Sequence, residues 1–275
     1  MNIGACVVLY NPCESKVLDN ISTYIEFVKC LVIVDNSTQE NNIKEIYKQN
    51  NKVIFVSMNG NKGIAKALNE GLQILISKKM DYALTMDQDS KFPREDINEI
   101  LLLLEKYSSY YSLIGLNYNH NVAIKKDTIV EVDCWLTSGN FVNLNCYKKV
   151  GGFCNDLFID YVDIEFDYKL KNNGMKIGYL EDYSLEHCIG NPIKIRIGKF
   201  IFYSMNHSEI RYYYRYRNSK ALYMNDKDFF RKYYFKEIFV NIPKMLIFEK
   251  NRMKKLKMIK KGLNDAKRGK MGEYR

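Results

Sequence analysis

Residues 63–90, GIAKALNEGLQILISKKMDYALTMDQDS, join an amphipathic helical pattern to a short β-rich run and an acidic loop. Apolar residues recur on one helical face, at Ile64, Leu68, Leu72, Leu75 and Ile76. The run YALTMD is typical of a buried strand, and it ends at carboxylate and amide side chains. A helix followed by such a strand is part of a βαβ unit, so this stretch predicts an α/β fold with a parallel sheet.

The flanking sequence repeats this alternation. The other expected strands are IGACVVLY, CLVIVD and KVIFVS, and NIKEIYKQN is a further crossover helix. A third helix is expected after Pro93, because proline suits the first helical position. After Ser112 shorter runs predict mixed or antiparallel strands that complete the sheet, namely SLIGLNY and TIVEVDCWLTSGNFVNL.

The chain of 275 residues is 47% apolar, which is enough for a large core. We expect a catalytic domain over residues 1–205 and a helical extension over 206–275, although length alone does not separate this from two domains.

The start, MNIGACVVLYNP, has no secretory pattern, and no run of about 18 apolar residues occurs. Seven cysteines without a CxxC pair indicate reduced thiols, and hence a cytoplasmic protein.

Polar residues end each of the first four expected strands. Ligands of open α/β sheets bind beyond these carboxyl ends, so the residues there are candidates for a site. Asp87 and Asp89 follow the fourth strand, and paired carboxylates suit Mg²⁺ or Mn²⁺ bound with phosphate oxygens. The alternative is that Asp89 caps the next turn while Asp87 is solvated. Neither GxxxxGK[ST] nor GxGxxG occurs, so a metal would have to neutralise the phosphates.

A set of motifs in a fixed order gives the resemblance to a known family. They are VVLYNP, LVIVDNS, NGNKGIAKALNEGL, LTMDQDS, TSGNFV, VGGFCNDLFIDYVDIEFDYKLKNNG, EHCIG and RYYYRYRN. In this order they resemble the family 2 glycosyltransferases, whose fold is GT-A. The DQDS and FIDYVDIEF segments look most like the rhamnosyltransferase branch, which uses dTDP-L-rhamnose to build O-antigens and capsules.

The resemblance implies a role for individual residues in binding the nucleotide sugar. The implied binding residues are Tyr10, Asn11, Asp35, Lys62, Gly63, Asn69, Asp87, Gln88, Arg211 and Arg217. Among these, Asp35 is expected to accept a hydrogen bond from the pyrimidine N3–H. Local alternatives stay open: Asp35 as a helix cap, Asn69 as a satisfied helix residue, and the arginines as a basic helical face.

The resemblance also implies an inverting, metal-dependent transfer, with Asp87, Asp89 and His187 as metal ligands. The base that inversion requires aligns with Asp163, and Asp160 is its acidic neighbour. Many relatives carry an acid directly before this aspartate, where the present chain has Val162. As the alternative, the spacing of Asp160, Asp163 and Asp167 predicts a solvated acidic stripe on one helix face.

The C-terminal part is strongly basic. Residues 194–275 contain 23 Lys/Arg and 7 Asp/Glu, a net charge of +16, whereas residues 1–193 have a net charge of −6. Residues 229–261 mix lysines with large apolar residues, a pattern that suits an anionic membrane interface or packing on a second subunit, as in a homodimer. No nucleic-acid-binding motif accompanies the charge, so nucleic acid is not expected as a partner.

The leading hypothesis is transfer of L-rhamnose from dTDP-L-rhamnose to a saccharide acceptor, expected to be lipid-linked, in capsule or O-antigen synthesis. Transfer of galactose, N-acetylglucosamine or galactofuranose from a UDP-sugar is the alternative within the family. A nucleotidyltransferase would need a basic glycine-rich loop after the first strand, which NPCESKV is not. A non-catalytic membrane scaffold is the alternative of another class. Such a scaffold does not require Asp87, Asp89 and Asp163.

Overall fold

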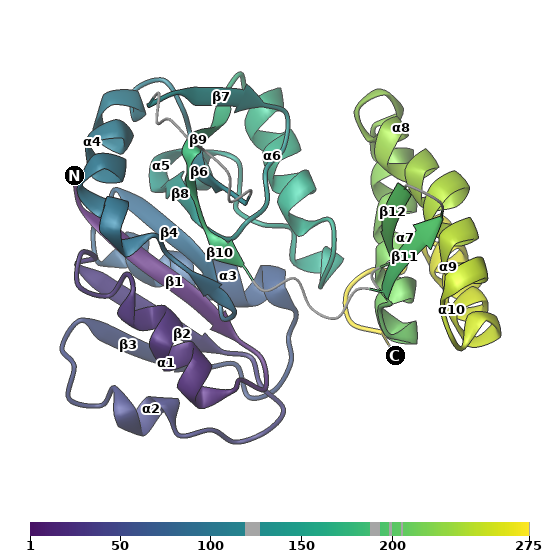
Figure 1. Cartoon of the computed structure of the whole chain (residues 1–275), viewed down its shortest axis with the longest axis horizontal. Helices are drawn as coiled ribbons and strands as arrows, with labels where there is room; N and C mark the ends of the chain where they lie inside the picture. Colours follow the sequence, from purple (N-terminus) through teal and green to yellow (C-terminus); the bar gives the residue numbers. More distant parts are fainter. Residues whose placement is uncertain (119–126, 188–192, 198–199, 205, 275) are drawn as a thin grey trace. The chain divides into compact units, whose positions relative to one another are not determined.

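The structure is a computed structural model that describes all residues except 119–126, 188–192, 198–199, 205 and 275 (Figure 1). The chain divides into two compact units, each described here by itself. The first unit contains residues 1–154 and 163–188, and the second contains 155–162 and 189–275. The predicted helical extension, 206–275, falls within the second unit.

The first unit is built on an eight-stranded sheet with the order β3-β2-β1-β4-β8-β6-β9-β7 (Figure 1). The strands are β1 (Ile3–Leu9), β2 (Cys30–Asp35), β3 (Val53–Ser57), β4 (Tyr82–Asp87), β6 (Leu113–Asn117), β7 (Ile129–Val132), β8 (Asn140–Asn143) and β9 (Ile177–Ser184). The first four pair in parallel, whereas β8 runs antiparallel to both β4 and β6. The predicted α/β fold, a parallel sheet with antiparallel strands added, is confirmed.

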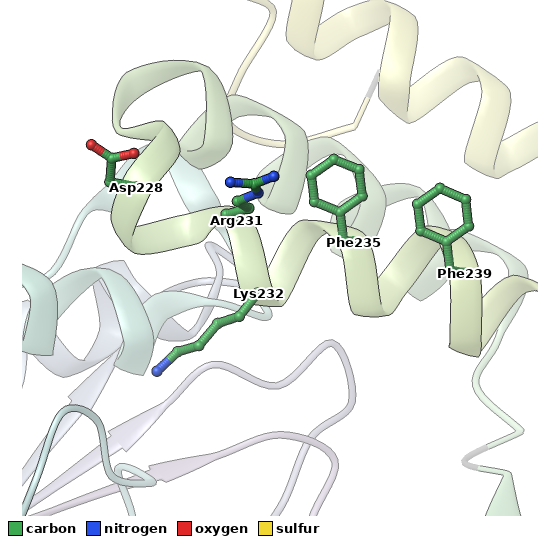
Figure 2. Close-up of a pocket in the computed structure, with 5 residues that line it drawn as sticks. All are labelled: Asp228, Arg231, Lys232, Phe235 and Phe239. Atoms are coloured by element: carbon green, nitrogen blue, oxygen red, sulfur yellow. The ribbon is translucent and has the colours of Figure 1, made fainter.

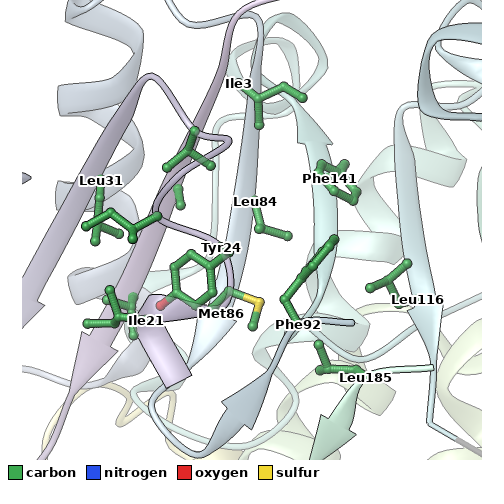
Figure 3. Packing of buried hydrophobic residues seen from close by; sticks show 14 of the residues in the cluster. Ile3, Ile21, Tyr24, Leu31, Leu84, Met86, Phe92, Leu116, Phe141 and Leu185 are labelled. Carbon is green, nitrogen blue, oxygen red and sulfur yellow. The ribbon is translucent and has the colours of Figure 1, made fainter. Parts of the chain in front are cut away.

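Helices cover both faces of this sheet. Residues of α1 (Glu14–Ser22) and α4 (Ile97–Tyr107) share one apolar core with alternate residues of the central strands. Figure 3 shows Ile21 of α1 in this core together with Leu31 and Leu84 of the strands. The opposite face receives α3 (Ile64–Ser77), where a Cβ on Gly71 would lie 2.3 Å from the Cys6 sulfur. Glycine is therefore required at this point for α3 to approach the sheet.

Further elements complete the chain up to residue 188. They are α2 (Ile43–Ile46), β5 (Ser90–Lys91), η1 (Arg94–Asp96), α5 (Leu144–Lys149), η2 (Asn155–Leu157), α6 (Val162–Asn172) and β10 (Glu186–His187).

The prediction that Asp160 shares a helix face with Asp163 is wrong. Phe158, Asp160 and Tyr161 have φ values of 65°, 62° and 68°, which right-handed helix excludes, so α6 begins only at Val162.

The second unit is mainly helical. Its elements are the hairpin β11 (Ile193–Ile197) and β12 (Phe200–Ser204), the helices α7 (Glu209–Asn225), α8 (Lys227–Lys236), α9 (Ile242–Phe248) and α10 (Arg252–Lys267), and a π-helix, η3 (Glu237–Asn241). A Cβ on Gly262 of α10 would lie 2.5 Å from the Tyr213 carbonyl oxygen of α7, so the two helices pack very closely. In the described residues, no helix is both long and apolar enough to cross a bilayer.

The described cysteine thiols differ in environment. Cys6 is buried in β1, and burial raises its pKa to about 12. Cys13 lies exposed just before α1, and a hydrogen bond with Ser15, 3.7 Å between Sγ and Oγ, lowers its pKa, helped by the Lys16 backbone. The two thiols therefore differ in both access and acidity.

Candidate functional site

The carboxyl ends of the central strands lie level with one another. Val8 is in register with Asp87 across β1 and β4, and Leu9 is in register with Asp35 across β1 and β2. The loops after these strands therefore leave the sheet at the same edge. The sequence predicted this convergence, and the site is built from it.

Gln88 joins the ends of β1 and β4. Its Oε1 accepts a hydrogen bond from the Tyr10 backbone N–H at 2.8 Å, and its Nε2 donates to the Tyr10 carbonyl at 3.2 Å. Asn20 of α1 donates to the Gln88 carbonyl at 2.7 Å. The Gln88 amide thus fixes two strand ends, while the Tyr10 side chain is 46% exposed beside it.

Asn11 and Asp35 organise the loop after β2. The Asn11 side-chain oxygen accepts from the Thr38 backbone N–H at 3.0 Å and the Gln39 backbone N–H at 3.1 Å. Asp35 accepts from the Ser37 backbone N–H and from the Asn41 amide, both at 3.1 Å. A carboxylate has about four acceptor positions, so these two bonds leave Asp35 able to accept from a ligand N–H.

Asp87 is the last residue of β4, and Asp89 follows it at this edge. The Asp87 backbone N–H donates to the Ser138 hydroxyl at 2.9 Å, which holds the start of the acidic loop. His187 of β10 is in register with Ser90 of β5, and Ser90 directly follows Asp89 in the chain. The His187 side chain lies outside the described part of the structure. Within the described residues, no group of three His, Cys, Asp or Glu is arranged to hold a metal ion.

Two carboxylates nevertheless fit the way in which Mg²⁺ binds together with a nucleotide. Such an ion takes one or two carboxylates and fills its remaining positions with water and phosphate oxygens. The donor set of Asp87 and Asp89 is compatible with this arrangement, since a diphosphate would supply the other oxygens.

The loop of residues 135–138, before β8, completes this edge, and sequence reasoning gave it no role. The Thr85 hydroxyl donates to the Thr137 carbonyl at 2.6 Å, and the Tyr118 hydroxyl donates to the Ser138 carbonyl. Burial raises the pKa of Tyr118, and the charges of Asp87 and Asp163 raise it further. Asp87, through its backbone bond to Ser138, and Asp163, which lines a cavity with Thr137, are both next to this loop.

Asp163 stands in the first turn of α6, half-buried. It lines a small cavity together with Trp135, Thr137 and Asp167. Asp167, one turn further on, is only 1% exposed and accepts from the Trp135 backbone N–H at 2.7 Å. Burial raises the pKa of Asp167 well above its ordinary value, and the charge of Asp163 adds to this. The predicted solvated acidic stripe is therefore wrong at Asp167.

The predicted nucleotide residues near α3 have different environments. The Lys62 side chain is exposed, and Gly63 has a φ of 86°, which a side chain would disfavour. Asn69 accepts from the Tyr147 hydroxyl at 2.6 Å and the Phe153 N–H at 2.9 Å, and it donates to the Phe153 carbonyl at 2.8 Å. Asn69 thus fits the alternative of a satisfied helix residue, and its nucleotide contact stays a prediction.

In the second unit Asp160 and Arg211 form an ion pair, with 3.1 Å between Arg211 Nε and Asp160 Oδ2. The turn that carries Asp160 is held by Asn218, whose amide donates to the Leu157, Ile159 and Asp160 carbonyls at 2.8–2.9 Å. Left-handed backbone of non-glycine residues is costly, and the three bonds from Asn218 help to stabilise it here.

Arg217 is 0% exposed. Its guanidinium donates to the carbonyls of Asp156, Leu157 and Gly272 and lies 5.0 Å from the centre of the Tyr214 ring. A diphosphate-binding role for Arg217 would require an exposed guanidinium, which this geometry does not provide. Arg217 supports the turn that carries Asp160.

The stability of the second unit should depend on pH through His207. Burial lowers the pKa of His207 from 6.5 to about 4; Arg211 and Arg215 contribute, while Asp160 and Glu249 partly oppose them. The unfolded chain then binds a proton below pH 6.5 that the folded chain resists, so the free energy of unfolding should fall between pH 6.5 and about 4. Urea titrations of the wild type and His207→Gln test this, because their difference separates His207 from the carboxylates. Parallel pH curves for the two proteins would contradict it.

The class of protein follows from the fold and the sheet edge together with a sequence match. The sequence model of the family described as Glycosyl transferase family 2 matches residues 5–154, more than half of the chain. The chain therefore belongs to glycosyl transferase family 2, and its sheet and helices have the GT-A fold of such enzymes.

Individual proteins resemble this chain in sequence or in fold. The chain is 28% identical over 239 residues to the dTDP-rhamnosyl transferase RfbF of Shigella flexneri, covering 80% of this chain and 79% of that protein. The crystal structure of S. aureus TarS matches 97% of the chain with a TM-score of 0.64 at 16% identity, and GalNAc-T7 with UDP, GalNAc and Mn²⁺ matches 96% with a TM-score of 0.64 at 12% identity. The chain spans 48% and 54% of these two chains, respectively.

Proposed function

We propose that this enzyme transfers L-rhamnose from dTDP-L-rhamnose to a saccharide acceptor, with inversion and with a divalent cation. The observation that carries the proposal is the common edge at which β1, β2 and β4 end: Asp87 ends β4 opposite Val8, Asp35 ends β2 opposite Leu9, and Asp89 follows two residues after Asp87. The similarity to a dTDP-rhamnosyl transferase over most of both chains supports the choice of sugar.

Three aspartates would bind different parts of the nucleotide-sugar donor. Asp35 would accept from the pyrimidine N3–H while keeping its contact with Ser37, since its carboxylate has acceptor positions to spare. Asp87 and Asp89 would hold Mg²⁺ or Mn²⁺, and the ion would neutralise charge on the departing diphosphate. That a GT-A structure has been solved with UDP and Mn²⁺ supports a divalent ion here.

Asp163 would act on the acceptor. Direct inversion needs a base that removes the proton of the attacking hydroxyl. Asp163 is half-buried and lines a cavity with Thr137, which precedes the Ser138 that accepts a hydrogen bond from the Asp87 N–H, and this supports Asp163 as the base. We expect the acceptor to be a lipid-linked saccharide of a capsule or O-antigen at the cytoplasmic side of the membrane.

Nucleoside diphosphate release from separate donors tests the proposal. With membrane lipid extract as acceptor source, we expect release from dTDP-L-rhamnose with Mg²⁺ or Mn²⁺, and at least about a 100-fold loss after chelation. UDP-galactose and UDP-N-acetylglucosamine serve as matched donors. Preference for either UDP-sugar would assign a hexosyltransferase of the same family, and equal rates with and without the cation would remove the metal role from Asp87 and Asp89.

A further inference from the structure

Two aromatic rings stand on the outer face of α8 and η3. Phe235 is 36% exposed and Phe239 is 68% exposed, and their rings stack 5.6 Å apart at an angle of 5°. Figure 2 shows both rings and Arg231 on the same side of the helix, whereas the Lys232 side chain extends from the other side. Arg231 and Lys232 are both among the residues that line the hollow. We name the surface formed by Arg231, Lys232, Phe235 and Phe239 the α8–η3 face.

The inner side of this segment is already filled. Phe230 of α8 is 1% exposed and Glu237 of η3 is 2% exposed. Glu237 accepts from Arg215 Nε at 2.8 Å, from the Tyr161 hydroxyl at 2.9 Å and from the Asn241 amide at 2.8 Å. These bonds direct Glu237 inward at the wide π-turn. Phe239 is left outside, where its exposure adds nothing to the packing of the unit.

Basic residues lie along the same segment as the exposed rings, and the Arg231 guanidinium lies 6.0 Å from the centre of the Phe235 ring. Lys227, Arg231, Lys232 and Lys236 are all exposed, and Asp228 is the exposed acid among residues 227–240. Most of the apolar face of α10 packs on α7, and Met253, 68% exposed at its first turn, is the large apolar residue of α10 that stays open to a partner. The α8–η3 face therefore offers both exposed apolar area and a local excess of positive charge.

We propose that the α8–η3 face binds the surface of an anionic lipid bilayer. Aromatic rings settle at the boundary between headgroups and acyl chains, and Arg and Lys beside them reach the lipid phosphates. A free phosphate would be attracted by the cations but would not cover the two rings. This proposal does not depend on the donor sugar or on the reaction.

Co-sedimentation of the full chain with vesicles tests the proposal. We expect binding to vesicles with phosphatidylglycerol and little binding to pure phosphatidylcholine, with a loss of binding as salt rises. Phe235→Ser/Phe239→Ser should weaken binding at least about tenfold. Arg231→Glu/Lys232→Glu should weaken it at least about 20-fold, because each basic side chain near an anionic surface contributes severalfold.

Matched variants in the first unit provide the controls. Leu102 of α4 is 68% exposed, as Phe239 is, and Lys148 and Lys149 are an exposed basic pair of α5. Leu102→Ser and Lys148→Glu/Lys149→Glu should bind vesicles like the wild type. Failure of the wild type to bind anionic vesicles, or unchanged binding of the Phe235/Phe239 variant, would overturn the proposal. The proposal would also be overturned if the wild type were a dimer, the Phe235/Phe239 variant a monomer, and neither protein bound vesicles. The face would then be a subunit interface.

Discussion

Asp163→Asn is expected to lower kcat by about 10²–10⁴-fold while the Kd for the nucleotide sugar changes little. Asparagine keeps the size of the side chain and an oxygen that can accept from the Ile164 N–H, as Asp163 does at 2.9 Å. It loses the ability to remove a proton from the acceptor. Initial rates and nucleotide titrations on the same preparation separate the two effects.

Two neighbouring aspartates give the controls for this prediction. The Asp156 side chain is exposed. Arg217 donates to the backbone carbonyl of Asp156, and Asp156→Asn leaves this carbonyl in place. The Asp156→Asn variant should therefore keep full turnover. Asp160→Asn breaks the ion pair with Arg211 and should reduce thermal stability more than Asp163→Asn does. Full activity of Asp163→Asn, or a larger loss in kcat for Asp160→Asn, would reassign the base.

Glu249→Ala should reduce the free energy of unfolding by about 3–5 kcal/mol. Glu249 is 1% exposed and lies 2.6 Å from the ammonium group of Lys255, which is 3% exposed. It also accepts from the Tyr212 hydroxyl at 2.8 Å and from the Ser204 hydroxyl. Removing Glu249 would leave a buried cation without its counter-charge, and urea denaturation would measure the cost.

The double variant Glu249→Leu/Lys255→Met tests the reason for that loss. Replacing both charges by apolar groups removes the uncompensated cation, so the double variant should be more stable than Glu249→Ala. Burial alone would raise the pKa of Glu249, but hydrogen bonds from Lys255, Ser204 and Tyr212 outweigh it and lower the pKa. The pair should therefore stabilise the fold above the ordinary carboxyl pKa and lose that effect in stronger acid. Equal stability of the single and double variants would contradict the charge argument.

The strands could be predicted from sequence because buried parallel strands are nearly continuous apolar runs that end at polar loops. CLVIVD and YALTMD coincide with β2 and β4. Helix α1 was not predicted, because its apolar side chains span little more than two turns after Pro12. The start of α6 was misplaced, since spacing alone does not reveal the left-handed turn at Asp160 and Tyr161.

The candidate site was only partly predictable. Strand ends are local features, so Asp35, Asp87 and Asp89 could be identified from the pattern of strands. The bond from Trp135 to Asp167 spans 32 residues and that from Asp87 to Ser138 spans 51, and no local pattern reports such pairs. Sequence also does not show whether a polar side chain faces a ligand or the protein, as Asn69 illustrates.

The exposed thiol of Cys13 gives a practical route to following ligand binding in solution. Its lowered pKa favours the thiolate, so a maleimide fluorophore should couple there near neutral pH, whereas buried Cys6 should react far more slowly. Cys13 is two residues from Asn11, which anchors the loop after β2. A dye at this position would report, through its emission, whether a nucleotide occupies the neighbouring strand ends.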